Sequence, residues 1–233
     1  MENTARRKHF LLLQVNDSVF PIGAYSHSYG LETYIQKGLV RNEEDAWAFL
    51  QTRMRYGFCY NEFLSAKLAY EYGSKGDLPA LAELEELLDA SRIPRETRDA
   101  AKKLGSRFIK TVKGMDIPYE STAFLDYCRD REGKITTHSV VYGVFCASVG
   151  ISEADTMEHF LYAQASAMVT NCVKLIPLSQ TSGQHLLYQS QDLFEEILTK
   201  LDSLTLDDLC LSAPGFDIRC MQHEGLYSRL YMS

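Results

Sequence analysis

The chain has 233 residues, of which 45% are hydrophobic and 11% aromatic, so it is long enough to fold around a sizeable core. Its formal charge of −7 and pI near 5.4 argue against a nucleic-acid-binding protein, because such proteins neutralise phosphates with Lys and Arg. The charged segment 1–9 lacks the apolar core of a signal peptide and the longest uncharged stretch, 136–152, is short for a membrane span, so we expect a cytoplasmic protein.

The first distinctive segment is the window of residues 14–32, which concentrates small polar residues around a turn. Pro21 and Gly23 provide the turn signal, the triplet Ser26-His27-Ser28 follows it, and Glu32 comes soon after. This density indicates contact with a partner, a ligand or another part of the backbone. A serine nucleophile is not indicated, since the window lacks the G-x-S-x-G spacing and a preceding strand.

After this window, apolar residues recur at three- and four-residue steps, the period of a helix. Helix start signals agree with this period: Asn42 precedes an acidic turn, Ser152 and Asp155 resemble a capping box, and Pro94 suits an opening turn. Runs that alternate with a period of two are scarce, and neither an internal repeat nor a long linker is visible. We therefore predict an all-α, single-domain bundle of about eight to ten helices over residues 1–233, with a flexible segment over 1–8.

Three stretches leave alternatives open. Residues 92–113 are strongly basic, which fits either a solvated helix face or an electrostatic dock for an acidic partner. Residues 139–149 and 160–176 are nearly uncharged helices, which fits either the centre of the bundle or an oligomer interface. Small residues in both, such as Gly143 and Ala163, allow close helix approach in either case.

A second cluster of polar residues follows the helix predicted over 160–176. Lys174 precedes the helix-breaking Pro177, and two amides, Gln180 and Gln184, come just after it. A lysine there complements the carbonyl end of the helix dipole, and two glutamines four residues apart share one helical face. Both a structural role and an interaction role fit these residues.

The C-terminal tail, residues 217–233, is rich in Met and Tyr at helical steps after a lapse of the pattern over 205–215. A terminus this apolar is costly to leave in water, so it either packs on its own domain or is held by another chain.

Residues with metal-binding chemistry are present but scattered. The six histidines form no H-x-x-x-H or H-E-x-x-H pair, and only His223 and Glu224 place two possible ligands together. The six cysteines contain no C-x-x-C pair and are interpreted as core thiols of a reducing compartment. No phosphate-binding loop is present either. We therefore expect neither a permanent metal centre nor a bound cofactor, and no catalytic residues.

Three motifs together resemble the UreF family of urease accessory proteins, and the resemblance covers almost the whole chain. The window at 14–32 is similar to the family's S-D-S-x-x-P-x-G-x-F-S-H-S-x-G-L-E, and residues 174–184 to K-x-[IV]-P-L-G-Q-x-x-G-Q. Residues 221–233 resemble the closing H-E-x-x-x-x-R-L-F-x-S, in a form similar to epsilonproteobacterial members. The departures are mild, with Asn16, Tyr25, Ser179 and Tyr231 in place of Ser, Phe, Gly and Phe.

The resemblance implies a non-catalytic, all-α homodimer that bridges the nickel-binding GTPase UreG and the scaffold protein UreD or UreH. In this role it modulates GTP-dependent nickel delivery to apo-urease, and nickel passes through the complex. The tail 217–233 is then the segment that binds the scaffold. The implied partner-binding residues are Tyr25, Ser26, His27, Glu32, Lys174, Gln180, Gln184, His223, Glu224, Tyr227, Arg229, Leu230 and Tyr231.

Two further expectations accompany this interpretation. His27 and His223 are the weak candidates for transient nickel contact. The residues also fit an alternative function, a small helical metal carrier or a non-catalytic enzyme subunit.

Overall fold

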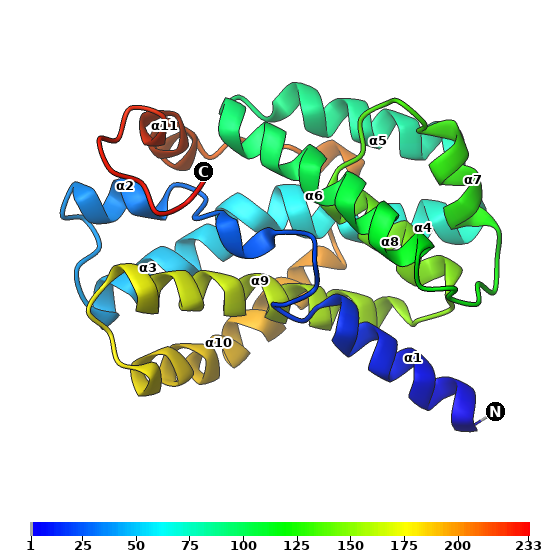
Figure 1. Cartoon of the computed structure of the whole chain (residues 1–233), viewed down its shortest axis with the longest axis horizontal. Helices are drawn as coiled ribbons and strands as arrows, with labels where there is room; N and C mark the ends of the chain where they lie inside the picture. Colours follow the sequence, from blue (N-terminus) through cyan, green and yellow to red (C-terminus); the bar gives the residue numbers. More distant parts are fainter. Residues whose placement is uncertain (1) are drawn as a thin grey trace.

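The computed structural model describes residues 2–233, apart from the side chains of residues 2–4 and 25. The described residues contain helices and no β-strand, which confirms the predicted all-α bundle (Figure 1). The elements in chain order are α1 (Glu2–Val15), the 3₁₀ turn η1 (Ala24–Ser26), α2 (Leu31–Gln36), α3 (Glu43–Thr52), the π-helix η2 (Arg53–Phe63), α4 (Leu64–Lys75), α5 (Leu78–Ser91), α6 (Arg95–Lys113), α7 (Ala123–Asp130), α8 (His138–Ser148), α9 (Glu153–Leu175), α10 (Gln180–Leu201), the 3₁₀ turn η3 (Leu206–Asp208) and α11 (Pro214–His223).

Helix α8 lies at the centre of the bundle, with α4 and α6 packed against it. Nine of its 11 residues are buried, so the predicted uncharged helix over 139–149 is a core helix. This follows from its composition, since a helix that is apolar on most sides is stable only where most sides are covered.

Small residues let α4 and α8 approach closely, as the sequence predicts for Gly143. A Cβ atom at Gly143 would collide with the backbone of Ala66 and would lie 2.9 Å from the nitrogen of Tyr70. On the other helix, a Cβ at Gly73 would lie 3.2 Å from the Cα of Val144. Burial of both helices therefore depends on residues without side chains at these crossing points.

The predicted helix starts at Asn42, Pro94 and Ser152 are confirmed. Asn42 caps α3 by accepting a hydrogen bond of 2.9 Å from the nitrogen of Asp45, and Ser152 caps α9 through the nitrogen of Asp155 at 3.1 Å. Pro94 directly precedes α6. Each cap satisfies backbone donors that the first helical turn leaves free.

The basic stretch corresponds mainly to α6, an amphipathic helix with one face in the core. Leu104, Phe108 and Val112 are buried, whereas Lys103 and Arg107 are exposed. The solvated face is thus what the isolated chain presents, and docking of an acidic partner stays a prediction.

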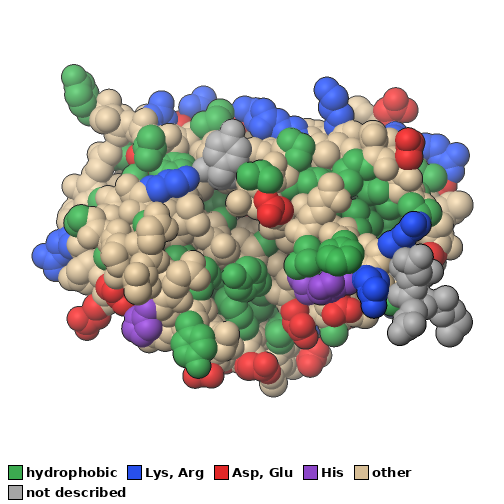
Figure 2. All heavy atoms as spheres, turned by 60° about the horizontal axis from the view of Figure 1, so that its bottom comes forward, with side chains coloured by type: hydrophobic (Ala, Val, Ile, Leu, Met, Phe, Trp, Pro, Cys, Tyr) green, Lys and Arg blue, Asp and Glu red, His purple; other side chains and the backbone are tan. Residues whose placement is uncertain are grey.

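Helix α9 differs from α8 because only one of its sides is covered. Phe160, Ala165 and Met168 are buried, but the Tyr162 side chain is 54% exposed. Figure 2 shows hydrophobic side chains at several places on the face that carries α1, α9 and α10. One side of this helix therefore lies in the core, and its role as an oligomer interface stays a prediction.

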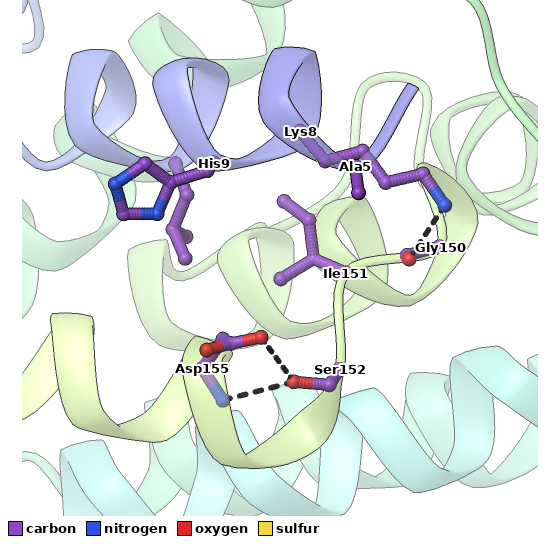
Figure 3. Close-up of a pocket in the computed structure, with 8 residues that line it drawn as sticks. Ala5, Lys8, His9, Gly150, Ile151, Ser152 and Asp155 are labelled. Carbon is purple, nitrogen blue, oxygen red and sulfur yellow. Dashed lines mark hydrogen bonds between the residues drawn. The ribbon is translucent and has the colours of Figure 1, made fainter. Parts of the chain in front are cut away.

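Helix α1 occupies part of the segment predicted to be flexible. It begins at Glu2, and Lys8 anchors it through an ion pair of 2.6 Å with Glu120 and a hydrogen bond of 2.8 Å to the Gly150 carbonyl. Figure 3 shows Lys8 reaching Gly150 across the hollow between α1 and the start of α9. The sequence pattern did not indicate this anchor, because Gly150 lies 142 residues away. Mobility of residues 1–8 stays a prediction.

The cysteines agree with their interpretation as core thiols. Cys59, Cys146, Cys172 and Cys220 are buried, Cys128 and Cys210 are half-buried, and all six are free. Burial raises the pKa of the Cys146 thiol to about 12, which keeps it protonated and unreactive. Within the described residues, no helix is both long and apolar enough to cross a membrane.

Candidate interaction site

Segments from the two ends of the sequence meet at one end of the molecule (Figure 1). Residues 26–33 contain the end of η1 and the start of α2, and residues 223–233 start at the last residue of α11. We call these two segments the motif–tail junction. Beyond His223 the tail is not helical, although the apolar steps predict a helix to its end. The junction explains this difference, because the tail backbone bonds to the motif instead of to itself.

The last two residues of the chain bond directly to the polar triplet of the motif. The nitrogen and Oγ of Ser28 donate to the Ser233 carbonyl at 2.6 and 2.8 Å, and the Met232 nitrogen donates to the Ser26 carbonyl at 2.8 Å. Ser233 is only 1% exposed. The tail therefore ends inside the fold of its own chain.

Glu32 holds the preceding part of the tail. Its carboxylate accepts hydrogen bonds from the nitrogens of Leu230 at 2.7 Å and Tyr231 at 3.0 Å. Gly30, just before it, has a positive φ of 86° and lets α11 lie close, because a Cβ there would be 3.0 Å from the Cys220 sulfur. Two backbone donors and His223 meet this one side chain, so Glu32 is a central acceptor of the junction.

His223 connects Glu32 to helix α6. Its Nε2 lies 2.9 Å from Glu32 and its Nδ1 lies 2.6 Å from Glu96, while Arg229 donates to the other oxygen of Glu96 at 2.7 Å. An imidazole donates from both nitrogens only when it is protonated. His223 thus links the two carboxylates inside the junction.

His27 lies under the tail and is held from two sides. Its Nδ1 lies 2.9 Å from the Ser233 hydroxyl, and its carbonyl accepts a bond of 2.9 Å from Asn171. Burial, together with the charges of Lys103 and Arg107, lowers the pKa of His27 to about 4. It is therefore neutral at pH 7 and acts in the junction as a hydrogen-bonding group without charge.

The second polar cluster lies at the turn between α9 and α10. Lys174 is exposed in the last turn of α9, and both Gln180 and Gln184 are exposed in the first turns of α10. Ser179, which replaces the glycine of the family motif, caps α10 by accepting a bond of 2.9 Å from the Ser182 nitrogen. The turn is thus well formed, and its lysine and amides face outward.

The predicted partner-binding residues fall into two groups. Glu32, His27, His223 and Tyr231 are buried in the junction and Ser26 is half-buried there, where they hold the tail. The Tyr25 side chain lies outside the described residues. The residues with exposed or partly exposed side chains, available to another molecule, are Lys174, Gln180, Gln184, Glu224, Tyr227, Arg229 and Leu230.

Two residues of the site were not predicted from the sequence. Glu96 bonds to both His223 and Arg229, and Asn171 bonds to His27. The only local signal for Glu96 was that it is one of two acids in a basic stretch, and Asn171 stood at the edge of the second cluster.

No group of three or more His, Cys, Asp or Glu residues in the described chain is arranged to hold a metal ion. Both ring nitrogens of His223 face carboxylates, and Nδ1 of His27 faces a hydroxyl. Transient nickel contact at these residues stays a prediction.

Comparison with known proteins shows which family this chain is similar to. The model of the UreF family matches residues 40–191, which include the second polar cluster. The chain is 36% identical over 224 residues to the urease accessory protein UreF of Bacillus sp. (strain TB-90), covering 95% of this chain and 97% of that protein. It is 33% identical over 223 residues to the protein of the same name from Lachnoclostridium phytofermentans, with the same coverages.

A third relative agrees with the other two. The protein of the same name from Haemophilus influenzae (strain Rd) is 36% identical over 228 residues, covering 95% of this chain and 94% of that protein. The similarity to these relatives thus extends beyond the residues that the family model matches, to 95% of the chain. They do not test the similarity to epsilonproteobacterial members, which stays a prediction.

Proposed function

The chain belongs to the UreF family of urease accessory proteins, and on this premise we propose that it acts in urease maturation as a non-catalytic adaptor. In this role it joins the GTPase UreG to the scaffold protein UreD or UreH, and modulates GTP-dependent delivery of nickel to apo-urease in the cytoplasm. Nickel is cargo of the assembly, and the chain holds no resident cofactor.

The observation that carries this proposal is the exposure of the tail where it lies on the motif. The Tyr227 side chain is fully exposed and that of Leu230 is 67% exposed. The backbone beside them is nevertheless held, since Gln36 donates to the Ser228 carbonyl and Glu32 accepts from the Leu230 nitrogen. Ordered and exposed aromatic and aliphatic side chains favour partner binding, because little conformational entropy is lost on contact. We assign this surface to the scaffold protein.

A second surface supports a homodimer. Phe10 and Leu13 of α1 and Tyr162 of α9 are exposed at 61%, 46% and 54%. Half-buried small residues, Ala163 and Ala167, lie beside Tyr162 on α9 and allow a second copy to approach closely. Lys174, at the end of the same helix, is assigned to the contact with the GTPase.

The scaffold contact is tested with the double substitution Tyr227→Ala and Leu230→Ala. Deletion of residues 217–233 is a poorer test, since it also removes the partners of Glu32 and Ser28. We expect the double variant to melt like the parent chain but to lose co-purification with the scaffold and urease activation on co-expression. Tyr188→Ala, which truncates a 72% exposed side chain on α10, is the matched control. Full scaffold binding by the double variant contradicts this assignment.

The GTPase contact is tested with Lys174→Ala. Lys75 is a matched control, since both lysines are exposed in the last turn of a helix. Each substitution is expected to cost less than about 1 kcal/mol of stability. Only Lys174→Ala is expected to lower GTPase co-purification and urease activation, and equal effects of the two variants refute the assignment.

Nickel binding separates the adaptor from a metal carrier. Equilibrium dialysis of the isolated protein against nickel is expected to show weak binding or none. A tight stoichiometric site favours the carrier.

A further inference from the structure

The π-helix η2 carries a buried arginine that no carboxylate neutralises. Arg53 is only 8% exposed, its Nε is buried without a hydrogen-bond partner, and no acidic oxygen of the described residues lies within 4 Å of it. The Phe58 and Phe216 rings lie at 4.9 and 4.7 Å from its guanidinium carbon. Aromatic faces attract a cation, but they accept no N–H in the plane of the guanidinium.

The backbone of η2 is shaped around this side chain. A Cβ atom at Gly57 would lie 2.9 Å from Cδ and 3.1 Å from Nε of Arg53, so only glycine leaves room for the arginine. π-helices are rare and are frequently found at functional sites. Since a buried charge without a partner is destabilising, the arginine is expected to meet a group that the free chain does not supply.

A second arginine lines the same cavity, which has a volume of about 260 Å³. Arg92 pairs with Glu62 at 3.0 Å through one terminal nitrogen, and its Nε is also buried without a partner. The exposed Ser212 lies at the rim. Two guanidinium groups beside one cavity supply the chemistry that an oxyanion needs, since its oxygens accept several N–H bonds at once.

The other charges around the cavity set the conditions for binding. Glu62 is balanced by Arg92, whereas Asp217 of α11 lines the cavity without an ion-pair partner within 4 Å among the described residues. Burial raises the pKa of Asp217 above its ordinary value, although the charge of Arg53 opposes this. An anion beside Arg53 repels an ionised Asp217, so binding and protonation of Asp217 support each other.

We propose that this cavity is a binding site for a small oxyanion, a carboxylate or a phosphate group, held by Arg53 and Arg92. A water molecule takes about 30 Å³ in the liquid, so a phosphate or a small carboxylic acid fits together with ordered water. The site is distinct from the partner contacts assigned above, although Tyr29 of the motif–tail junction also lines the cavity. Because α11 contributes Asp217 to its wall, and Phe216 of the same helix packs on Arg53, the ligand connects η2 to the helix that leads into the tail.

The proposal is tested by titration calorimetry of the full chain with potassium phosphate or potassium succinate, at constant ionic strength in chloride. We expect saturable binding of at least one anion, weakened about tenfold or more by Arg53→Met. Asp217→Asn is expected to strengthen binding, because it removes the repelling carboxylate. Arg129→Met, at a guanidinium that is 77% exposed, is the matched control and leaves binding unchanged.

Each outcome decides the proposal. Binding of phosphate alone or of succinate alone supports it and identifies the group. Ser212→Trp blocks the rim without altering the core, and is expected to abolish binding even if Arg53→Met fails to fold. Absence of saturable binding to the parent chain overturns the proposal, as does binding that survives both Arg53→Met and Ser212→Trp.

Discussion

Helices α4 and α8 meet through small and apolar residues, whereas the motif–tail junction is made of charged and polar groups. In the first region, Gly143 and Gly73 bring two backbones into contact. In the second region, Glu32 and His223 join segments 191 residues apart in the sequence. Close packing tolerates no change of volume, but hydrogen bonds to water replace those of a junction when it opens. The first region therefore sets the fold, and the second is suited to respond to partners.

The largest effect is expected for Gly143→Ala, which breaks the core contact. The added methyl group collides with the backbone of Ala66 on α4, so the two helices have to separate. We expect a loss of about 3 kcal/mol in the free energy of unfolding, measured by urea denaturation. Gly215→Ala is the control, because no atom lies within 4 Å of the new Cβ. Equal stability of the two variants contradicts the close approach of α4 and α8.

The next effect concerns Glu85, a buried carboxyl in the core. It accepts bonds from the Tyr127 hydroxyl and from the Thr137 nitrogen, and burial raises its pKa from 4.5 to about 7. The folded chain thus binds a proton more tightly than the unfolded one, and its stability falls as the pH rises from 4.5 through 7. Glu85→Gln cannot ionise, so the two stability curves are expected to diverge by roughly 2–3 kcal/mol toward pH 8.

Urea denaturation between pH 5 and pH 8 measures this divergence. Glu83→Gln, at an exposed side chain of the same helix α5, is the control. Parallel curves for Glu85→Gln and the parent chain would show that Glu85 is ionised without cost.

For Glu32→Gln we expect a small change in the stability of the whole fold and a large change in the local stability of the tail. The amide weakens the bonds from the Leu230 and Tyr231 nitrogens and removes a charge beside His223. We expect the tail to open about tenfold more often, while the unfolding midpoint of the core changes little. Limited trypsin digestion measures this as faster cleavage after Arg229, with cleavage after the exposed Lys134 as the internal control. Equal acceleration at both sites means that the junction and the core unfold together.

The smallest effect is expected for His27→Asn. It is measured as a change in the pH dependence of folding stability. The unfolded histidine takes up a proton near pH 6.5 and the folded one at about 4, so the parent chain loses stability as the pH falls through this range. The variant is expected to lose less. Part of the pH dependence of stability remains in the variant, because burial also lowers the pKa of His138 to about 4. Thermal melts at pH 7 and pH 5 compare the two proteins, and identical shifts refute the buried neutral state of His27.

The two regions also differ in how far the sequence predicts them. Helix α8 could be predicted from a local property, an uncharged stretch that includes Gly143. A helix that is apolar on most sides has to be buried on most sides. The caps at Asn42 and Ser152 followed from neighbouring residues. The π-helical form of η2 did not, because three- and four-residue steps through Met54 and Phe58 are equally compatible with an α-helix.

For the junction, the sequence predicted only that a polar segment and an apolar segment each contact another group. The pairing of Glu32 with the nitrogens of Leu230 and Tyr231 has no periodic signal, since it depends on the path of the whole chain. Family resemblance marked both segments, but not that they bind each other. Glu96 was missed for the same reason, because its partners His223 and Arg229 lie 127 and 133 residues away.

Native-state hydrogen exchange of the isolated protein tests most directly whether the tail is docked on the motif. The amides of Leu230, Tyr231 and Met232 donate to Glu32 and Ser26, so they are expected to be protected without any partner present, and to lose protection in Glu32→Gln. The Tyr227 amide belongs to the exposed part of the tail and is the internal reference. Exchange of all four amides at the rate of an unfolded peptide would contradict a tail that is ordered by its own chain.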